Sequence, residues 1–407
     1  MNGRERSLLV VTPWFPPTRE GWPYPFIGQS CIALAKRGWI VKALVVRTWK
    51  PSWLAQRPGS RVEAPIDTEA FPELGEIETM HTYSLPRQRL APLSNRILDA
   101  RARRRLAQGP LSIEGADAVL VHTEGLAPAI VPLCRQARKP VAVVVHGVNT
   151  SRAFMEAPRQ KARLKGALAA ASRVVLVGEP LRAHFSRYVG RDDHFRVVAN
   201  GVVVPEAPPV SILDDGRPLR LVSVANLQEG KGIDIALRAM ARLLSEGMCD
   251  WRYQLVGEGP ERAALERLVD ELALRSQVTF AGALQNAQVM RLLAQSDVFV
   301  LPSYREAFGI AYLEAMATGL IAIGVEGEGP SQFIRHGETG LLVAPRSVEA
   351  VADAIRPMLG GERAPYRAMA AAGAMEARRD WSWERHAEAL ERVLEESMRE
   401  PCGENGR

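Results

Sequence analysis

Residues 302–317 decide the fold, and they read PSYREAFGIAYLEAMA. The stretch follows an apolar run at 298–301 and passes into helix-forming residues, which is typical of a strand–loop–helix unit. On one continuous helix, Glu306 and Glu314 would lie about 80° and ~12 Å apart, too far to share one metal ion. If the helix begins near Phe308 instead, Glu306 lies in the loop and the amides of Phe308 to Ile310 form an anion-binding N-terminus. The two carboxylates could then hold hydroxyl groups at the two ends of an extended ligand.

Short, almost continuously apolar runs recur along the chain with helical segments between them. Such runs are typical of strands buried on both faces, and the alternation predicts parallel sheets covered by helices. The runs lie at 7–12, 40–46, 119–122, 141–145, 174–177 and 196–198, and at 219–224, 253–256, 278–280, 298–301, 320–323 and 341–343. A Pro- and Asp-rich stretch at 202–218 separates the two halves. We therefore expect an α/β protein with two Rossmann-like, doubly wound parallel-sheet domains and a ligand cleft at the carboxyl ends of the strands.

Length and composition limit the class of protein. A chain of 407 residues favours two domains, and an apolar fraction of 47% excludes a disordered chain. No apolar run approaches the ~20 residues that cross a bilayer, and the first one stops at Pro13, too early for a secretory signal. The four cysteines form no C-x-x-C pair and no cluster with metal spacing, which predicts reduced thiols in a cytoplasmic protein.

The net charge of +6 has a local source. Seven arginines crowd the Arg87–Arg105 segment with Asp99 as the single acid, and they are Arg87, Arg89, Arg96, Arg101, Arg103, Arg104 and Arg105. Apolar residues between them form a rough helical stripe. The segment therefore predicts either an amphipathic helix on an anionic membrane surface, or a solvated helix face or mobile loop. Nucleic acid is the weakest interpretation, because no aromatic interleaving or binding motif accompanies the charge.

The 302–317 stretch resembles the Glu-x7-Glu donor motif of the family-four retaining glycosyltransferases, relatives of bacterial polysaccharide, mannosyl and sucrose-phosphate synthases. Further motifs follow the family's order: EGKG at 229–232, VGEGP at 256–260, a glycine-rich stretch at 324–329, HGETGLLV at 336–343 and WSWE at 381–384. In the first half, NGV at 200–202 is similar to the interdomain signature, and HG at 146–147 to a strand-end motif. The resemblance is close over 200–384 and looser before that.

The resemblance implies the GT-B architecture. Residues 1–205 would form an acceptor-binding domain, 206–384 a nucleotide-sugar donor-binding domain, and 385–407 a C-terminal helix and tail packing back on the first domain. It also implies a retaining hexosyltransferase that uses a nucleotide-diphosphate sugar, UDP-linked first and GDP-mannose second, without a cofactor. The acceptor would be a glycan or a polyprenyl-linked molecule in surface polysaccharide or glycoconjugate synthesis. No Asp-x-Asp stands at a strand end, so no metal is expected, and the expected location is the cytoplasm with the inner face of the plasma membrane as a peripheral site.

The same resemblance assigns the site residues. Three are catalytic: Glu306 lies beside the donor-sugar hydroxyls, His146 reaches the donor sugar, and the Lys231 ammonium meets the diphosphate. Glu314 binds the ribose. The donor-binding set is Asn226, Lys231, Gly257, Glu258, Glu306, Ala307, Phe308, Gly309, Ile310 and Glu314. The family usually has Arg where Asn226 stands, which weakens diphosphate binding or leaves that contact to another cation.

Two other functions fit the same plan. A nucleotide-sugar epimerase or hydrolase would need no sugar acceptor, and a non-catalytic sugar-nucleotide-binding subunit would explain Asn226. The presence of Glu306, Glu314 and Lys231 together disfavours the subunit. A dinucleotide-dependent dehydrogenase is disfavoured because no Gly-x-Gly-x-x-Gly loop follows the first strand.

Overall fold

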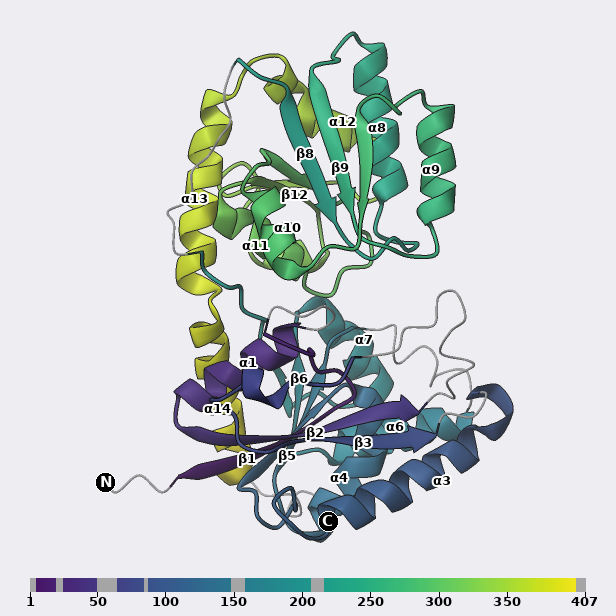
Figure 1. Ribbon diagram of the computed structural model, residues 1–407, viewed down its shortest axis with the longest axis vertical. Helices are drawn as coiled ribbons and strands as arrows, with labels where there is room; N and C mark the ends of the chain where they lie inside the picture. The colour runs from purple at the N-terminus through teal and green to yellow at the C-terminus, as the bar shows by residue number, and fades with distance from the viewer. Residues whose placement is uncertain are drawn as a thin grey trace. The chain divides into compact units, whose positions relative to one another are not determined.

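The protein forms two compact units. A computed structural model describes residues 5–19, 25–49, 64–83, 87–147, 158–205 and 216–399. The first unit comprises Met1–Ala199 and Trp383–Arg407, and the second comprises Asn200–Ser382. Most of the linker expected at 202–218 lies outside the described residues. Each unit is an α/β layer structure (Figure 1), which confirms the fold class that the apolar runs predict.

A parallel seven-stranded sheet forms the centre of the first unit, in the order β3-β2-β1-β4-β5-β6-β7. Its strands are β1 (Arg6–Thr12), β2 (Trp39–Trp49), β3 (Ile77–Tyr83), β4 (Ala118–His122), β5 (Val141–Val145), β6 (Arg173–Leu176) and β7 (Phe195–Val197). Every residue of β4 and β5 is buried, because helices cover both faces of these central strands.

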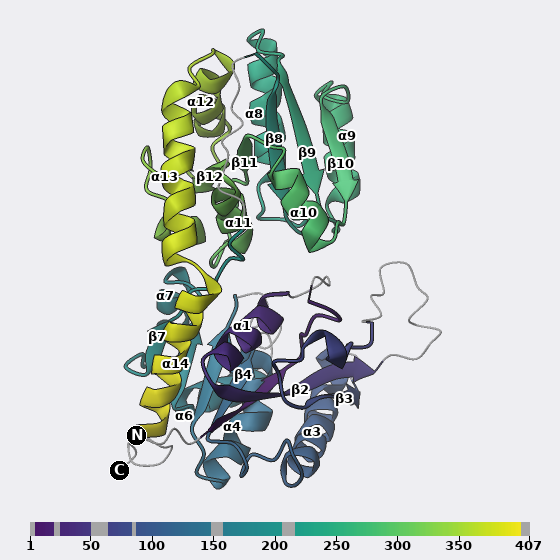
Figure 2. The same ribbon diagram turned by 60° about the vertical axis from the view of Figure 1, so that its left-hand side comes forward.

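Helices cover the first sheet on both sides. They are α1 (Pro25–Lys36), α3 (Arg87–Leu106), α4 (Ala127–Gln136), α6 (Pro158–Ala170), α7 (Pro180–Val189) and α14 (Trp383–Arg399). Helices α1 and α14 lie side by side on one face (Figure 2), although they come from opposite ends of the chain. On the other face α3 contacts α4, α4 contacts α6, and α6 contacts α7.

The second unit is built on a parallel six-stranded sheet in the order β10-β9-β8-β11-β12-β13. Its strands are β8 (Leu219–Val224), β9 (Trp251–Val256), β10 (Val278–Gly282), β11 (Val298–Val300), β12 (Ile321–Val325) and β13 (Leu341–Val343). Its helices are α8 (Ile233–Ser245), α9 (Arg262–Glu271), α10 (Asn286–Leu293), α11 (Ile310–Thr318), α12 (Val348–Leu359) and α13 (Ala364–Asp380). Helix α8 contacts α9 and α12, and α11 contacts α10 and α13, so the helices form one layer on each face.

Strand β3 was not among the expected strands. It lies at the edge of the first sheet, and in its sequence IETMHTY the polar residues Thr79 and His81 are exposed on either side of buried Met80. A search for continuous apolar runs finds strands buried on both faces and overlooks an edge strand of this kind. The three described cysteines, Cys31, Cys134 and Cys249, form no disulfide. Within the described ranges, no helix has the length and apolar character needed to cross a membrane.

Candidate active site

The 302–317 motif bridges β11 and α11. Glu306 lies in the loop, Glu314 lies in the helix, and α11 begins at Ile310, two residues later than Phe308. Gly309 takes φ 95° as the N-cap, a left-handed conformation that glycine adopts without strain. Within the described residues, no acceptor pairs with the amides of Phe308, Gly309 and Ile310. The loop therefore presents free N–H groups at the positive end of a helix.

The glycine turn before α8 docks directly on this loop. The Tyr304 amide donates to the Gly230 carbonyl at 2.9 Å, and the Ser303 hydroxyl donates to the same oxygen at 3.1 Å. A Cβ atom added to Gly232 would lie 2.1 Å from the Pro302 carbonyl oxygen, so only glycine fits there. These contacts hold Gly230 and Gly232 on the loop and therefore fix the backbone of Lys231 between them.

Lys231 and Glu306 meet as an ion pair. The distance from Lys231 Nζ to Glu306 Oε2 is 2.7 Å, and the two side chains are 19% and 14% exposed. Residues 75 positions apart in sequence thus place one cation and one anion beside the free amides of the α11 loop. Such a cluster can hold an anionic group and a hydroxyl group of one ligand at the same time.

Glu328 is a part of this site that the sequence did not single out. Its Oε2 accepts from the Glu306 amide at 2.8 Å, and the Gly329 amide donates to the Glu306 carbonyl at 2.8 Å. A Cβ atom on Gly329 would lie 2.5 Å from the Phe308 nitrogen. Burial, and then the charge of Glu306, raise the pKa of Glu328. The sequence identified the glycine-rich stretch at 324–329 only as one motif in the family's order, and nothing in it indicated that Glu328 is the partner of Glu306.

Glu314 lies within α11, where it faces α10 instead of the Lys231–Glu306 pair. Asn286 Nδ2, at the first residue of α10, lies 3.5 Å from Glu314 Oε1. Burial raises the pKa of Glu314 to about 7, and the Asn286 hydrogen bond opposes that shift. This carboxyl group therefore changes its charge near neutral pH, unlike an ordinary surface glutamate.

The turn after β9 closes against the strand-end segment that contains Asn226. Gly257 has φ 130°, and a Cβ atom there would lie 1.8 Å from the Ala225 carbonyl oxygen. The Leu227 amide donates to the Glu258 carbonyl at 3.0 Å. Glu258 makes this contact through its backbone carbonyl, and its side-chain carboxylate pairs with Arg262. The turn thus has a clear structural role.

Asn226 is exposed, and its side chain makes no hydrogen bond within the described part of the chain. A different cation lies close to the Lys231 turn. The stem of Arg305 would lie 3.1 Å from a Cβ atom on Gly230, and its guanidinium is 3.7 Å from exposed Glu229. The structure therefore brings Arg305, which the sequence placed only inside the quoted motif, next to the turn.

His146 belongs to the first unit, directly after β5, and it pairs with a second histidine. His122, the last residue of β4, places Nδ1 3.0 Å from His146 Nε2, and the two rings stack with centroids 5.2 Å apart. Trp14 and Phe26 pack their rings against His146. Burial, then the proximity of His386, lower the pKa of His146 to about 3, and burial holds the pKa of His122 well below its ordinary value. Both rings are neutral at physiological pH.

Hydrogen bonds define the tautomers of these histidines. His386 of α14 places Nδ1 2.7 Å from the Ala199 carbonyl, so Nδ1 carries the proton and Nε2 accepts from the Ser30 hydroxyl at 2.8 Å. His122 Nε2 is buried and unpartnered among the described residues. An orphaned buried N–H is rarer than an orphaned acceptor and costs about 1–3 kcal/mol. We therefore assign the His122 proton to Nδ1, which donates to His146 Nε2 and leaves the His146 proton on Nδ1.

Replacing His122 tests this assignment. Asparagine can keep an N–H near the Nδ1 position, whereas phenylalanine keeps the ring and removes the donor. In ¹⁵N-histidine-labelled protein, the His146 resonances should show the Nδ1–H tautomer in the wild type and in His122→Asn, and a mixture of tautomers in His122→Phe. A His146→Gln variant identifies the signals. An Nε2–H tautomer of His146 in the wild type would refute the assignment.

No group of three or more His, Cys, Asp and Glu side chains that could hold a metal ion occurs in the described portion of the chain. The second unit by itself groups one lysine, three carboxylates and free helix amides, and the first unit by itself holds a neutral histidine pair. Sites at the carboxyl ends of parallel strands in doubly wound folds bind nucleotides and similar ligands. The two doubly wound parallel-sheet units are those of the GT-B fold class.

Comparisons with known proteins identify the family. Residues 26–204 match the family described as Glycosyltransferase Family 4, and residues 209–376 match Glycosyl transferases group 1. The chain belongs to the family-four glycosyltransferases.

Curated relatives are glycosyltransferases or related enzymes by name, and a solved structure shares the fold. The chain is 36% identical over 142 residues to N-acetyl-alpha-D-glucosaminyl L-malate synthase of Bacillus anthracis, covering 35% of this chain and 36% of that protein. It is 32% identical over 152 residues to the amylovoran biosynthesis glycosyltransferase AmsK of Erwinia amylovora, covering 36% and 37%. These alignments thus span about a third of each relative. The Anabaena HepE structure in complex with UDP-glucose is 18% identical, with a TM-score of 0.72 over 96% of this chain and 99% of that one.

Proposed function

We propose that this protein transfers a hexosyl group from a nucleotide-diphosphate sugar to a glycan or lipid-linked acceptor in surface polysaccharide or glycoconjugate synthesis. The transfer retains the anomeric configuration and needs no metal ion. A UDP-sugar is the first donor to test and GDP-mannose the second. The observation that carries the proposal is the Lys231–Glu306 pair in the loop whose amides at Phe308, Gly309 and Ile310 are free.

The reaction builds negative charge on the departing diphosphate as the bond from the sugar C1 to oxygen breaks. Lys231 and the free amides at the start of α11 are the groups that stabilise this charge, each contributing a few kcal/mol. In the protein without donor, Glu306 neutralises Lys231. When the donor binds, the ammonium turns to the diphosphate, and the Glu306 carboxylate accepts from the sugar hydroxyls.

Arg305 supplies the second cation in this proposal. The diphosphate carries two negative charges, and Glu306 and Glu328 add acidic groups beside it. Lys231 alone leaves this charge uncompensated. The Arg305 stem lies over Gly230, and its guanidinium lies 3.7 Å from exposed Glu229 and 5.9 Å from the centre of the Tyr304 ring. Contacts this long at the surface hold a guanidinium weakly, so Arg305 can turn toward the phosphates in place of an arginine at 226.

His146 acts as a neutral hydrogen-bonding group and not as a proton donor. Its lowered pKa keeps the ring uncharged at the pH of the cell. The tautomer assigned above leaves an N–H on Nδ1 to contact a donor-sugar hydroxyl. The proton of the acceptor hydroxyl therefore passes to the departing diphosphate oxygen, on the same face of the sugar, which accounts for retention.

The pH dependence of donor binding tests the ribose contact of Glu314. A carboxylate accepts hydroxyl protons better than a carboxylic acid does, so binding favours the charged form and releases a proton. With a pKa of about 7 in the free protein, affinity should rise about tenfold from about pH 6 to about pH 8. Isothermal titration calorimetry measures this affinity. The ligand should be an intact sugar nucleotide, because the terminal phosphate of a free nucleotide itself titrates at about pH 6 and would add its own pH dependence.

Glu314→Gln is the control for that measurement. Glutamine keeps the hydrogen-bonding oxygen but has no charge to lose, so its affinity should stay flat over the same range. An equal rise in wild type and Glu314→Gln would assign the pH dependence to another group and remove Glu314 from the donor site.

The membrane is the proposed location of the lipid-linked acceptor. Helix α3 spans the Arg87–Arg105 segment, so the segment is helical, as the membrane interpretation requires. Leu93 on this helix is 47% exposed, an apolar side chain turned away from the core. A basic helix with an outward apolar side chain such as Leu93 fits the negatively charged face of a bilayer.

A further inference from the structure

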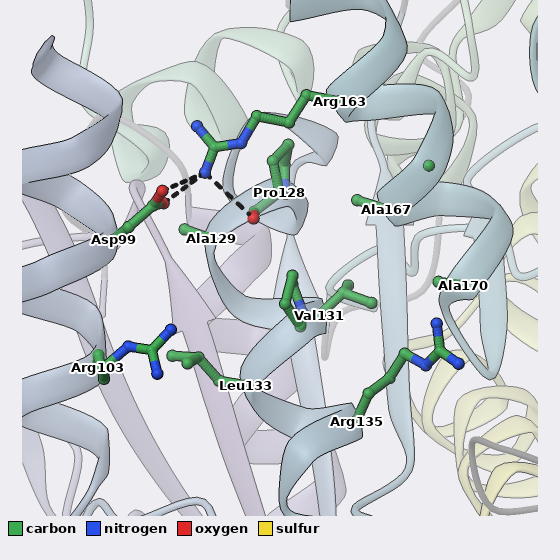
Figure 3. A pocket seen from close by; sticks show the side chains of 12 residues that line it. Asp99, Arg103, Pro128, Ala129, Val131, Leu133, Arg135, Arg163, Ala167 and Ala170 are labelled. Atoms are coloured by element: carbon green, nitrogen blue, oxygen red, sulfur yellow. Dashed lines mark hydrogen bonds and ion pairs between the residues drawn. The ribbon is translucent and has the colours of Figure 1, made fainter. Parts of the chain in front are cut away.

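A cavity of about 400 Å³ lies among α3, α4 and α6 of the first unit (Figure 3). None of the proposed donor-site residues lines it. Its walls are mostly small or apolar side chains, namely Pro128, Ala129, Val131, Leu133, Ala167 and Ala170. Arginines surround them: Arg103 comes from α3, Arg135 from α4 and Arg163 from α6. A hollow of this size with an apolar wall and a few convergent polar groups is typical of a small-molecule site.

The three arginines are not equivalent. Arg163 is held in place by Asp99 and also donates to the Pro128 carbonyl at 3.3 Å. Arg103 and Arg135 pair with no carboxylate among the residues that the structure describes. Figure 3 shows them on either side of Leu133. Two uncompensated guanidinium groups therefore face an apolar hollow from two different helices.

The surrounding helices cannot neutralise this charge. Helix α3 contains seven arginines, α4 contains Arg135, and α6 contains four basic residues. Asp99 is the only acid in the sequences of the three helices, and it is occupied by Arg163. The cavity thus has a strongly positive rim, and its occupant must carry negative charge together with an apolar part.

We propose that this cavity binds the phosphate headgroup of an anionic membrane lipid, with Arg103 and Arg135 on the phosphate and the start of the acyl chain against α4 and α6. Arginine suits the phosphate because its planar group donates two parallel hydrogen bonds. The apolar wall selects a lipid over a free phosphate ion, which has nothing to place there. This proposal rests on the proposed function, which places the enzyme at a membrane to reach a lipid-linked acceptor. Vesicle binding is therefore measured separately from sugar transfer.

Gly166 allows the cavity to be blocked without changing any charge. It lines the hollow from α6, and a Cβ atom added there would meet nothing within 4 Å. Leucine is also a better helix former than glycine, so Gly166→Leu should fold normally. Ala162→Leu is the matched control, since Ala162 is exposed on the same helix and does not line the cavity.

Two matched double variants test the charges. Arg103→Gln/Arg135→Gln removes the two free guanidinium groups. Arg96→Gln/Arg159→Gln removes two exposed charges from α3 and α6 that lie outside the cavity lining. The second variant reports the loss that any two basic residues on this face would cause.

Binding is measured by co-sedimentation with phosphatidylcholine vesicles with and without phosphatidic acid. The wild type should bind the phosphatidic acid vesicles, Arg103→Gln/Arg135→Gln should lose about 30-fold in affinity, and Gly166→Leu should lose about tenfold. Ala162→Leu should bind like the wild type, and Arg96→Gln/Arg159→Gln should lose clearly less affinity than Arg103→Gln/Arg135→Gln, because its charges contact no phosphate in the cavity. Equal losses in the two arginine pairs, or wild-type binding by Gly166→Leu, would overturn the cavity as the lipid site.

Competition separates the two sources of phosphate. Soluble short-chain phosphatidic acid should displace the protein from vesicles, and inorganic phosphate at the same concentration should not. Displacement by both alike would mean that the site takes free phosphate, which contradicts the proposal. All variants should transfer sugar normally to detergent-dispersed lipid acceptor. Transfer missing even in the wild type would refute the proposed function while leaving the vesicle result to stand or fall alone.

Discussion

Replacing Glu306 by glutamine should lower the turnover number about 100-fold or more while the protein stays folded. The substitution keeps the shape of the side chain and removes the charge that orients the donor sugar. It also breaks the 2.7 Å pair with Lys231, so the ammonium becomes free for the diphosphate. Affinity for the free nucleotide diphosphate should therefore stay constant or increase, whereas turnover collapses.

Steady-state kinetics and nucleotide titration on the same preparation measure this separation. Glu338→Gln serves as the control, since Glu338 is an exposed glutamate of the same unit whose pairing with Arg335 lies on the surface. Unaltered turnover in Glu306→Gln would exclude Glu306 from the reaction. A parallel loss of diphosphate affinity would mean that the loop itself has rearranged.

Replacing Lys231 by methionine should reduce both turnover and affinity, by about 100- to 1000-fold in turnover. Methionine keeps the length of the side chain and loses the ammonium that faces the leaving group. The loss in affinity should be large for a nucleoside diphosphate and small for the monophosphate, because the contact is to the terminal phosphate. Arg267→Met, on the exposed side of α9, removes one charge elsewhere in the unit and should leave both values unchanged.

The two substitutions should not be additive. Lys231 and Glu306 touch, so each single change leaves the partner without its counter-charge. The double variant Lys231→Met/Glu306→Gln should lose much less than the product of the two single losses. Independent, multiplicative losses, or equal weakening of monophosphate and diphosphate binding by Lys231→Met, would contradict the shared role of the pair.

Much of the fold could be predicted because parallel strands buried on both faces are recognisable as apolar runs. The runs at 119–122 and 141–145 became β4 and β5, with all their residues buried. Strand β3 lacked this signal, since an edge strand keeps polar residues on its open side. The helix after β11 could be placed because helix-forming residues follow the apolar run at 298–301, and it begins at Ile310, two residues after Phe308.

The site was only partly predictable. Glu306, Glu314 and Lys231 lie in short motifs whose local chemistry is visible in sequence. Glu328 binds the Glu306 amide, and His122 binds His146, through contacts between segments 22 and 24 residues apart. Neither motif contains a signal for its partner, because such contacts depend on which strands are neighbours in the sheet. The shifted pKa of Glu314 has the same origin, since burial decides it.

The most direct test of the proposed reaction is a panel of nucleotide sugars incubated with the protein, with and without a membrane-lipid extract. Free nucleotide diphosphate and free sugar are both quantified. We expect one donor, UDP-linked or GDP-linked, to release its nucleotide only when the extract is present, with the sugar recovered in the lipid fraction. Equal release without extract, with the sugar appearing free in solution, would contradict transfer and indicate hydrolysis, and no release from any donor would contradict catalysis altogether.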